Sequence, residues 1–222
     1  MREHHLAKYY PAFIDVSNRT CIVIGGSDIG RDKVEKLIDC GASVRVISPE
    51  PESWLTELER NDQIEWIKRK YQSGDLKDAF IAILADTNEQ NINIKVSDEA
   101  SERNVLLNVV DVTHLCTFIA PSVANRGEVT IATSTGGASP ALARTFREKI
   151  EAECPCRLLE FADLAPLLSW ARGVVKEKNW IINPSYWQEC INEELLDMVQ
   201  SGSQDLARER LISCLEKGVL QR

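Results

Sequence analysis

The sequence predicts an α/β protein in which a parallel sheet with helices is followed by a small β-containing segment and then by an all-α C-terminal domain. Apolar runs without charged residues recur along the first half of the chain, as expected for strands buried on both faces. Helical patterns separate these runs, and strands that alternate with helices at this spacing form a right-handed parallel sheet. After residue 151 the pattern is helical throughout.

Length and charge limit the class of protein further. The 222 residues are enough to bury a core in one or two domains. The net charge of −8 argues against a general nucleic-acid binder. No apolar stretch approaches the ~20 residues of a membrane span, and residues 1–5 lack the apolar region of a secretory signal. We therefore expect a cytoplasmic protein without nucleic-acid or membrane partners.

The first apolar run, residues 20–24, ends in the turn Gly25-Gly26-Ser27-Asp28-Ile29-Gly30 and opens into a helical pattern that ends at Gly41. A strand, glycine turn and helix in this order form a Rossmann-like βαβ unit, in which a dinucleotide pyrophosphate lies on the helix N-terminus. Ser27 replaces the second glycine of G-x-G-x-x-G, so either Ser27 adapts or nucleotide binding is weaker. An ordinary strand-to-helix turn without a ligand is the alternative.

A second strand over residues 43–48 ends at Pro49 and Glu50. In a dinucleotide fold an acidic residue about 20 positions after the glycines accepts a hydrogen bond from the ribose 2′-OH. Glu50 is the near candidate, and no basic cluster stands beside it in the sequence. This arrangement favours NAD over NADP.

Two further apolar runs, residues 80–85 and 105–110, flank a helical pattern over 89–103 and end close to Thr87 and Asp111. The carboxyl ends of parallel strands meet at the edge where open α/β sheets bind ligands. Asp111 is therefore a candidate general base or metal ligand. The alternative is a turn residue that closes a strand.

The pattern changes after residue 118. Two short strands, 119–124 and 128–133, form a hairpin signal. The turn Ser134-Thr135-Gly136-Gly137-Ala138-Ser139-Pro140 follows, with Ser139 as the helix N-cap and proline at the first helical position. This second glycine-rich turn is another place where an anion could meet free N–H groups.

The segment 120–150 is locally basic in an acidic chain and contains Arg126 and Arg144. These arginines are candidates for binding an anionic ligand, and a solvated helix face is the alternative for Arg144. In the helical tail we expect a set of large apolar residues to be buried: Leu158, Leu159, Leu164, Leu167, Leu168, Trp170, Trp180, Trp187, Leu195 and Leu196.

Seven cysteines are scattered without a C-x-x-C pair. Cys21 in the first strand and Cys40 at a helix end are typical of reduced, buried cysteines. Cys154 and Cys156 lack a nearby cluster of further ligands, so we interpret them as incidental thiols at a helix terminus and not as a zinc site. No metal site is expected.

Several stretches in the same order along residues 9–150 carry a family resemblance: Tyr10-Pro11-Ala12-Phe13-Ile14-Asp15, Val23-Ile24-Gly25-Gly26, Arg31-x-Lys33, Asn108-Val109-Val110-Asp111, Phe118-Ile119-x-Pro121 and Ser134-Thr135-Gly136-Gly137-Ala138-Ser139-Pro140-Ala141-Leu142-Ala143-Arg144. Together they resemble the precorrin-2 dehydrogenase family, also found as the N-terminal module of siroheme synthase. The resemblance is weak in the helical tail.

The resemblance implies hydride transfer from precorrin-2 to NAD+ to give sirohydrochlorin, with Fe2+ insertion in some members. It implies a Rossmann NAD-binding domain over residues 1–118, a dimerisation and tetrapyrrole-binding segment over 119–150, a helical domain over 151–222, and a homodimer. Asp111 falls on the catalytic aspartate of the family. The cofactor-binding set is Gly25, Gly26, Ser27, Asp28, Ile29, Pro49, Glu50 and Thr87.

A tetrapyrrole of this kind carries eight carboxylates, so a chain of net negative charge needs local donors for them. The candidate substrate-binding set is Arg126, Ser134, Thr135, Gly136, Gly137, Ser139 and Arg144. Two departures from the family are present. In the glycine turn, Ser27 replaces the usual third consecutive glycine and Gly30 replaces the usual alanine. Thr135 stands where siroheme synthases can carry a second serine, a change that preserves a hydroxyl. Two alternatives stay open: a tetrapyrrole chelatase that has lost NAD use through Ser27, and a non-catalytic nucleotide-sensing module.

Overall fold

A computed structural model describes residues 9–50, 52–152 and 157–219. The chain divides into two compact units, which are described separately. The first comprises Met1–Ala120 with Gly136–Ala138, and the second comprises Pro121–Thr135 with Ser139–Arg222. The prediction for Cys154 and Cys156 concerns residues outside the described ranges.

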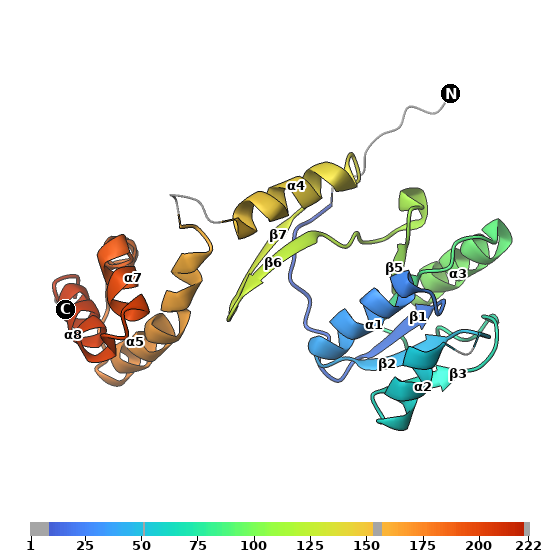
Figure 1. Ribbon diagram of the computed structural model, residues 1–222, viewed down its shortest axis with the longest axis horizontal. Coiled ribbons are helices and arrows are strands. Elements are labelled where there is room, and N and C mark those ends of the chain that lie inside the picture. Colours follow the sequence, from blue (N-terminus) through green and yellow to red (C-terminus); the bar gives the residue numbers. More distant parts are fainter. Residues whose placement is uncertain (1–8, 51, 153–156, 220–222) are drawn as a thin grey trace. The chain divides into compact units, whose positions relative to one another are not determined.

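Five parallel strands form the centre of the first unit, in the order β3-β2-β1-β4-β5 (Figure 1). They are β1 (Thr20–Ile24), β2 (Ser43–Ile47), β3 (Ile64–Ile67), β4 (Ile81–Leu84) and β5 (Leu106–Val109). Strands β1, β2, β4 and β5 each lie inside a segment that the sequence predicts as a strand, so the parallel sheet is confirmed. The chain order reverses between β1 and β4, which makes the carboxyl end of β1 the switch point of the sheet.

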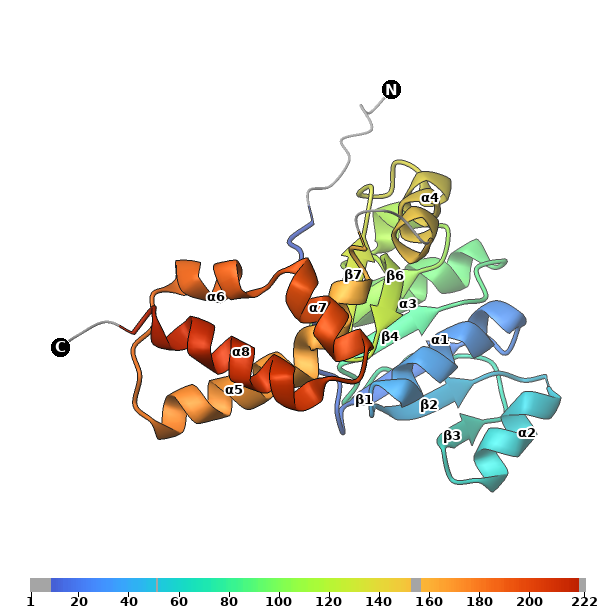
Figure 2. The ribbon, with the colours of Figure 1, turned by 60° about the vertical axis from the view of Figure 1, so that its left-hand side comes forward.

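Helices cover both faces of this sheet. α1 (Asp28–Asp39) and α2 (Ser53–Arg60) pack on one face, and α3 (Gln90–Arg103) packs on the other. Figure 2 shows α1 running along β1 and β2. Because side chains from alternate positions of β1, such as Val23 and Ile22, enter opposite clusters, the strand is apolar from its second residue to its end.

One buried carboxylate joins α3 to the connection between β3 and β4. Glu99 accepts hydrogen bonds from the hydroxyl of Tyr71, from the backbone N–H of Gly74 (2.9 Å) and Leu76 (3.1 Å), and from Arg103 (2.8 Å). Burial opposes ionisation, but these four donors together hold the pKa of Glu99 below its ordinary value. The ionised carboxylate therefore fixes the segment that leads into β4.

The second unit begins with an antiparallel hairpin of β6 (Ser122–Arg126) and β7 (Val129–Thr133), as the sequence predicts. α4 (Pro140–Glu151) packs on this hairpin. Ser139 is the N-cap of α4, because its Oγ accepts a hydrogen bond from Leu142 N at 3.2 Å. The predicted capping pattern of serine followed by proline is thus confirmed.

The remainder of the second unit is helical. Its elements are the 3-10 helix η2 (Glu160–Leu164) and the α-helices α5 (Ala165–Glu177), α6 (Pro184–Cys190), α7 (Glu193–Gln200) and α8 (Gln204–Glu216). Leu164, Leu195 and Leu196 are fully buried in its core, as predicted. The expectation of burial is wrong for Leu158, which is 54% exposed, and for Trp170, whose ring lies at the surface beneath the Arg208 guanidinium.

The cysteines of the two units differ in pairing and exposure. A disulfide joins Cys190 to Cys214, which the sequence pattern does not predict. Cys21 is buried and unpaired as expected, whereas the unpaired Cys40 is exposed at the end of α1 instead of buried. Over the residues that the structure describes, no helix combines the length and apolarity needed to cross a membrane.

Candidate functional site

The turn between β1 and α1 is shaped by close packing around its glycines. A Cβ on Gly25, where φ is +116°, would lie 2.8 Å from the backbone N of Asp86. A Cβ on Gly26 would lie 2.6 Å from Ser48 Oγ, and one on Gly30 would lie 2.3 Å from the carbonyl oxygen of Gly25. Side chains are therefore excluded at these three positions, and the backbone stays bare at the N-terminus of α1. A bare helix N-terminus at a switch point is a place where a dinucleotide pyrophosphate fits.

Ser27 stands in this turn without conformational strain. Its φ of −63° is open to every L-amino acid, so the position does not require glycine. Ser27 is the N-cap residue of α1, yet its hydroxyl makes no capping hydrogen bond. Asp28 and Ile29 follow in the first helical turn, where N–H groups lack intrahelical acceptors. The replacement of glycine by Ser27 thus leaves the shape of the turn intact.

Two tryptophans fix the loops beside the glycine turn. Trp54 of α2 donates from Nε1 to the carbonyl oxygen of Gly26 at 3.1 Å, and Trp66 of β3 donates from Nε1 to the carbonyl oxygen of Ser48 at 3.0 Å. Ser48 follows β2 directly and precedes Pro49 and Glu50, which are both exposed. Sequence reasoning missed both tryptophans, because nothing in their local pattern shows that they reach loops 28 and 18 residues away.

A lysine lies near the candidate ribose-binding residue Glu50. Lys70 donates to Glu89 at 2.7 Å, which raises the pKa of the lysine, and the charges of Asp86 and Glu50 act in the same direction. The sequence shows no basic residue beside Glu50, because Lys70 is brought there from the segment after β3. The charge of Lys70 is paired with that of Glu89.

The loop after β4 packs directly on the glycine turn. Asp86 N donates to the carbonyl oxygen of Ile24 at 3.2 Å. The carbonyl oxygen of Thr87 accepts a hydrogen bond from Asn93 Nδ2 at 3.0 Å. Asn93 is 4% exposed and its Oδ1 has no hydrogen-bond partner among the described residues. Thr87 is therefore held at the carboxyl edge of the sheet by a residue of α3 that the sequence pattern does not single out.

Asp111 lies at the same edge, two residues after β5, in the left-handed region with φ of +60°. Its side chain is exposed, and its carboxylate pairs with no other group among the residues that the structure describes, so the oxygens face solvent. Aspartate is one of the few residues that tolerate this conformation. The backbone of Asp111 forms part of a turn. Its carboxylate is available to accept a hydrogen bond or a proton.

The chain that follows Asp111 is tied back along β5. Asn108 donates from Nδ2 to the carbonyl oxygen of Phe118 at 3.1 Å, and Thr117 Oγ1 accepts from Leu107 N at 2.7 Å. The thiol of Cys116 accepts from Val109 N at 3.2 Å. These bonds on both sides of the turn hold Asp111 in place, so its left-handed conformation is determined by its neighbours.

The second glycine-rich turn is shaped by a side chain. Thr135 Oγ1 accepts from Ser139 N at 2.9 Å and donates to the carbonyl oxygen of Ser139 at 3.0 Å. Gly136 and Gly137 have φ of +64° and +89°. A Cβ on Gly137 would lie 3.2 Å from Cγ2 of Thr113, two residues after Asp111. Gly137 therefore lies beside the segment that carries the candidate base.

The two candidate arginines are paired with carboxylates inside the second unit. Arg126 donates to both oxygens of Asp163, at 2.8 and 2.6 Å. This bidentate hydrogen bond raises the pKa of Arg126 and lowers that of Asp163. Arg144 donates to Glu148 one helical turn away at 2.7 Å. The structure thus groups Gly25, Thr87 and Asp111 along one edge of the sheet, and it places the two arginines in other ion pairs.

A doubly wound parallel sheet with a glycine turn at its switch point defines the Rossmann-like class of dinucleotide-binding proteins. A family model described as "Putative NAD(P)-binding" matches residues 12–122, and one described as "Sirohaem biosynthesis protein central" matches residues 126–153. The chain belongs to this NAD(P)-binding family, whose model covers half of its length.

Comparison with known proteins gives relatives along nearly the whole chain. It is 34% identical over 213 residues to siroheme synthase of Thioalkalivibrio sulfidiphilus and 34% identical over 205 residues to that of Photobacterium profundum. These matches cover 95% and 92% of this chain but 43% of each relative, so the chain spans less than half of their length. A solved structure described as "SirC, precorrin-2 dehydrogenase" is similar with a TM-score of 0.68 at 21% identity, covering 94% of this chain and 100% of that one. This likeness shows that the fold is shared.

Proposed function

We propose that the chain is an NAD-dependent precorrin-2 dehydrogenase of siroheme biosynthesis. Two hydrogens leave precorrin-2, one as a hydride to NAD+ and one as a proton, and sirohydrochlorin is the product. The observation that carries the proposal is the bare glycine turn at the switch point, in a chain whose relatives over nearly all of its length are siroheme synthases.

In this proposal the first glycine turn and its flanking loops hold the dinucleotide. The N–H groups of Ser27, Asp28 and Ile29 face the pyrophosphate, with Gly25 and Gly26 as the bare backbone of the turn. Glu50, after Pro49, accepts a hydrogen bond from the adenosine 2′-OH, which selects NAD because a 2′-phosphate would meet this carboxylate. Thr87 borders the cofactor at the end of β4. The bound cofactor supplies the hydride acceptor.

Asp111 is the general base in this proposal. Its carboxylate is exposed at the carboxyl edge of the sheet, and its position is fixed by the bonds of Asn108 and Thr117. A base must be within hydrogen-bond reach of the proton that it takes and must be held there. Asp111 accepts the proton from the tetrapyrrole while the hydride leaves.

The carboxylates of the tetrapyrrole need donors, and we assign these to the second glycine turn and its surroundings. The turn that would receive a carboxylate is formed by Ser134, Gly136 and Gly137. Thr135 and Ser139 keep its shape through their mutual hydrogen bonds. Arg126 and Arg144 bind substrate carboxylates in exchange for Asp163 and Glu148. The exchange replaces one charge-assisted hydrogen bond by another.

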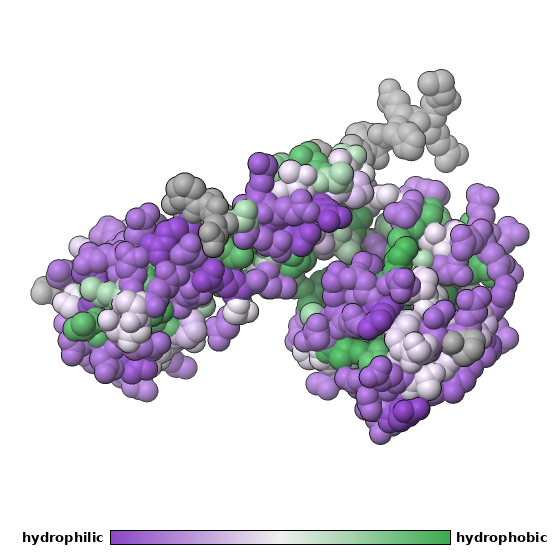
Figure 3. Space-filling view, in the orientation of Figure 1, coloured by the Kyte–Doolittle hydropathy of each residue, from purple (hydrophilic) through white to green (hydrophobic). Residues whose placement is uncertain are grey.

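We further propose a homodimer in the cytoplasm. The hairpin of β6 and β7 offers strand edges for pairing. α4 exposes Leu142 and Phe146, each close to half of its surface, and Figure 3 shows hydrophobic surface over α4. A symmetric second copy would cover both features.

An anaerobic turnover assay of the full chain with precorrin-2 tests the proposed function. We expect sirohydrochlorin and reduced cofactor to form in equal amounts with NAD+, and turnover with NADP+ at least about tenfold lower. Glu50→Gln is expected to narrow the difference between the two cofactors. Absence of sirohydrochlorin together with saturable NAD+ binding, followed by tryptophan fluorescence, would indicate a nucleotide-sensing module instead. Absence of NAD+ binding, with iron incorporation from Fe2+ and sirohydrochlorin, would indicate the chelatase alternative.

A further inference from the structure

The disulfide Cys190–Cys214 lies beside a hollow at the surface of the helical part of the second unit. The hollow has a volume of about 240 Å³ and is lined by both cysteines and by Asn192, Arg210, Leu211, Ser213 and Lys217. Cys190 is 3% exposed, whereas Cys214 on α8 is half-buried. Of the two cysteines that line the hollow, Cys214 is therefore the more accessible to a small molecule.

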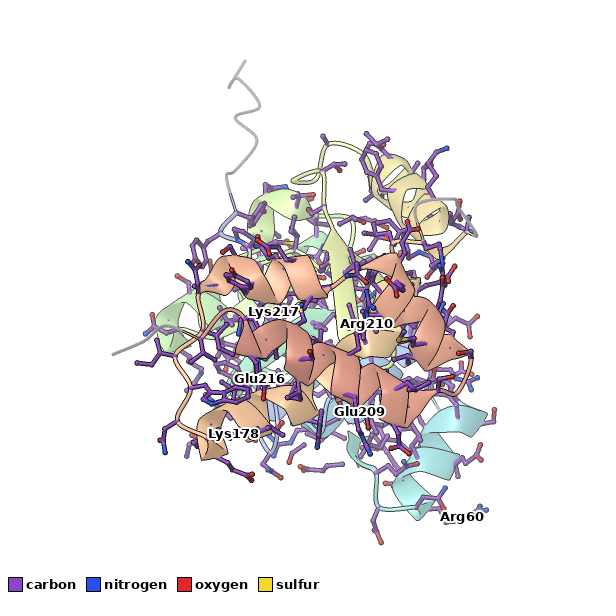
Figure 4. All side chains as sticks on the ribbon, turned by 90° about the vertical axis from the view of Figure 1, so that its left-hand side faces the viewer. Arg60, Lys178, Glu209, Arg210, Glu216 and Lys217 are labelled. Carbon is purple, nitrogen blue, oxygen red and sulfur yellow. A yellow bond between two sulfur atoms is a disulfide. The ribbon has the colours of Figure 1, made fainter. Side chains whose placement is uncertain are left out.

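The charged groups that line the hollow are cationic. Arg210 and Lys217 are seven residues apart and share one side of α8, the side toward α6 in Figure 4. Glu209 and Glu216 lie on the opposite side of the helix, where Lys178 pairs with Glu216 at 3.7 Å. Arg210 is paired with Glu194, and Lys217 has no ion pair within the described part of the chain. A net positive charge therefore borders the sulfurs.

We propose that this hollow is a thiol–disulfide exchange site for small anionic thiols. The geometry directs an incoming thiolate to Cys214, the accessible sulfur, with Lys217 attracting its negative charge. The new bond joins the incoming sulfur to Cys214 Sγ, and the bond to Cys190 breaks, so Cys190 leaves as a thiolate and takes a proton from solvent. A second thiolate attacks the mixed disulfide, and the result is two protein thiols and one small-molecule disulfide.

Thiol–disulfide exchange at this site changes how α6 is attached to α8. This seven-residue helix is attached to α8 by the disulfide, and the backbone bond from Asn183 N to the carbonyl oxygen of Gly218 (3.3 Å) holds its other end. Reduction removes the covalent attachment and leaves the non-covalent one. In a reducing compartment, the redox state of the small thiols therefore determines whether α6 is covalently attached to α8.

The test measures how the charge of a thiol affects reduction of this disulfide in the full folded chain. The probes are 2-mercaptoethanesulfonate, which is anionic, 2-mercaptoethanol, which is neutral, and cysteamine, which is cationic. Rates are obtained by alkylation and peptide mapping of Cys190 and Cys214 and are corrected for the thiolate fraction of each probe. We expect the anionic thiol to react roughly fivefold faster than the cationic one.

Matched lysine variants identify the source of that preference. Lys217→Gln should abolish most of it, whereas Lys178→Gln, on the other side of α8, should leave it unchanged. Equal rates for the three thiols, or equal effects of the two variants, would overturn the proposal. So would the recovery of both cysteines as free thiols after treatment of the purified chain with a mild oxidant.

Serine variants test which sulfur is attacked. In Cys190→Ser the remaining Cys214 should be modified quickly by the symmetrical disulfide of 2-mercaptoethanesulfonate, with the adduct located by peptide mapping. In Cys214→Ser the buried Cys190 should be modified at least about fivefold more slowly. The opposite order would contradict the assignment of Cys214 as the accessible sulfur. Circular dichroism recorded in parallel establishes that both variants are folded.

Discussion

The two glycine-rich turns of the chain, residues 25–30 and 134–140, have similar compositions but depend on different parts of the molecule. In the first turn, an added Cβ would lie 2.8 Å from the loop after β4 at Gly25, 2.6 Å from Ser48 at Gly26 and 2.3 Å from the turn's own Gly25 carbonyl oxygen at Gly30. In the second turn, the Thr135 hydroxyl bonds to both backbone groups of Ser139, and the closest approach to an added Cβ at Gly137 is 3.2 Å.

The difference teaches how each turn keeps its backbone shape. The first turn relies on the packing of β1, α1 and the loop after β4, so its shape depends on the whole sheet. The second turn relies on a local hydrogen-bond pair, so its shape depends on one side chain. Substitutions that separate packing from local hydrogen bonding should therefore affect the two turns differently.

Gly30→Ala should have the largest effect on stability. The added methyl group would lie 2.3 Å from the carbonyl oxygen of Gly25, a backbone atom that cannot move aside without shifting the turn. We expect a loss of about 3 kcal/mol in the free energy of unfolding and loss of NAD+ binding. Gly173→Ala in α5 is the matched control, because nothing lies within 4 Å of its added Cβ. Chemical denaturation that gives equal stabilities for the two variants would contradict the packing account of the first turn.

Glu99→Gln tests whether the sheet beneath the first turn depends on a buried charge. The pKa of Glu99 is lowered in the folded state, so its contribution is fully present above the ordinary value of 4.5 and is lost as the pH falls through the folded pKa. We expect the variant to lose about 2 kcal/mol at pH 7 and to show a flatter pH dependence of stability below pH 4.5. Glu102→Gln, an exposed position on α3, should leave both unchanged. Parallel pH profiles for the wild type and Glu99→Gln would refute the assignment.

Thr135→Val tests the hydrogen-bond account of the second turn. The variant keeps the shape of the side chain but removes both bonds to Ser139, and we expect a loss of about 1 kcal/mol in the free energy of unfolding. Thr135→Ser should restore most of it, and Thr130→Val on an exposed position of β7 should be neutral. NAD+ affinity should not change in any of these variants. A loss of NAD+ affinity in Thr135→Val would show that the two turns are not independent.

Ser27→Gly should have the smallest effect. The φ of −63° at Ser27 suits serine as well as glycine, and the hydroxyl does not cap α1. We expect a stability change of a few tenths of a kcal/mol, about 0.3, and a change in NAD+ affinity of less than roughly threefold. A gain of more than tenfold in affinity by fluorescence titration would mean that the hydroxyl obstructs the cofactor. That result would favour the chelatase alternative.

Much of the fold follows from the sequence because its strands are buried on both faces and therefore lack charges. The parallel sheet, the turn at Gly25 and the cap at Ser139 were all predicted from local sequence patterns. The contacts of Trp54, Trp66 and Lys70 could not be predicted, since each joins segments that are remote in sequence. The contact of Asn93 and the burial of the helical tail could not be predicted either. Trp170 is a residue type typical of a core, but its ring lies at the surface beneath Arg208.

Only part of the candidate site could be predicted from the sequence. Motif residues such as Asp111 could be identified by their place after a strand, but the left-handed conformation that holds Asp111 comes from the hydrogen bonds of the segment after it. The pairing of Arg126 with Asp163 joins residues 37 positions apart, which no local pattern reveals. The disulfide between Cys190 and Cys214 likewise depends on helix packing, because the two cysteines are 24 positions apart in the sequence.

The central claim is that Asp111 is the base of a dehydrogenase whose cofactor lies on the first glycine turn. Asp111→Asn keeps the left-handed backbone, because asparagine tolerates it, but removes the proton acceptor. Asp62→Asn is the matched control: Asp62 is also exposed, with φ of +54°, in the turn before β3. The decisive measurement is kcat for sirohydrochlorin formation from precorrin-2 and NAD+, with NAD+ affinity measured on the same samples. The account predicts a fall in kcat of about 10²–10⁴-fold for Asp111→Asn, none for Asp62→Asn, and unchanged NAD+ affinity in both. Equal kcat values for the two variants would contradict it.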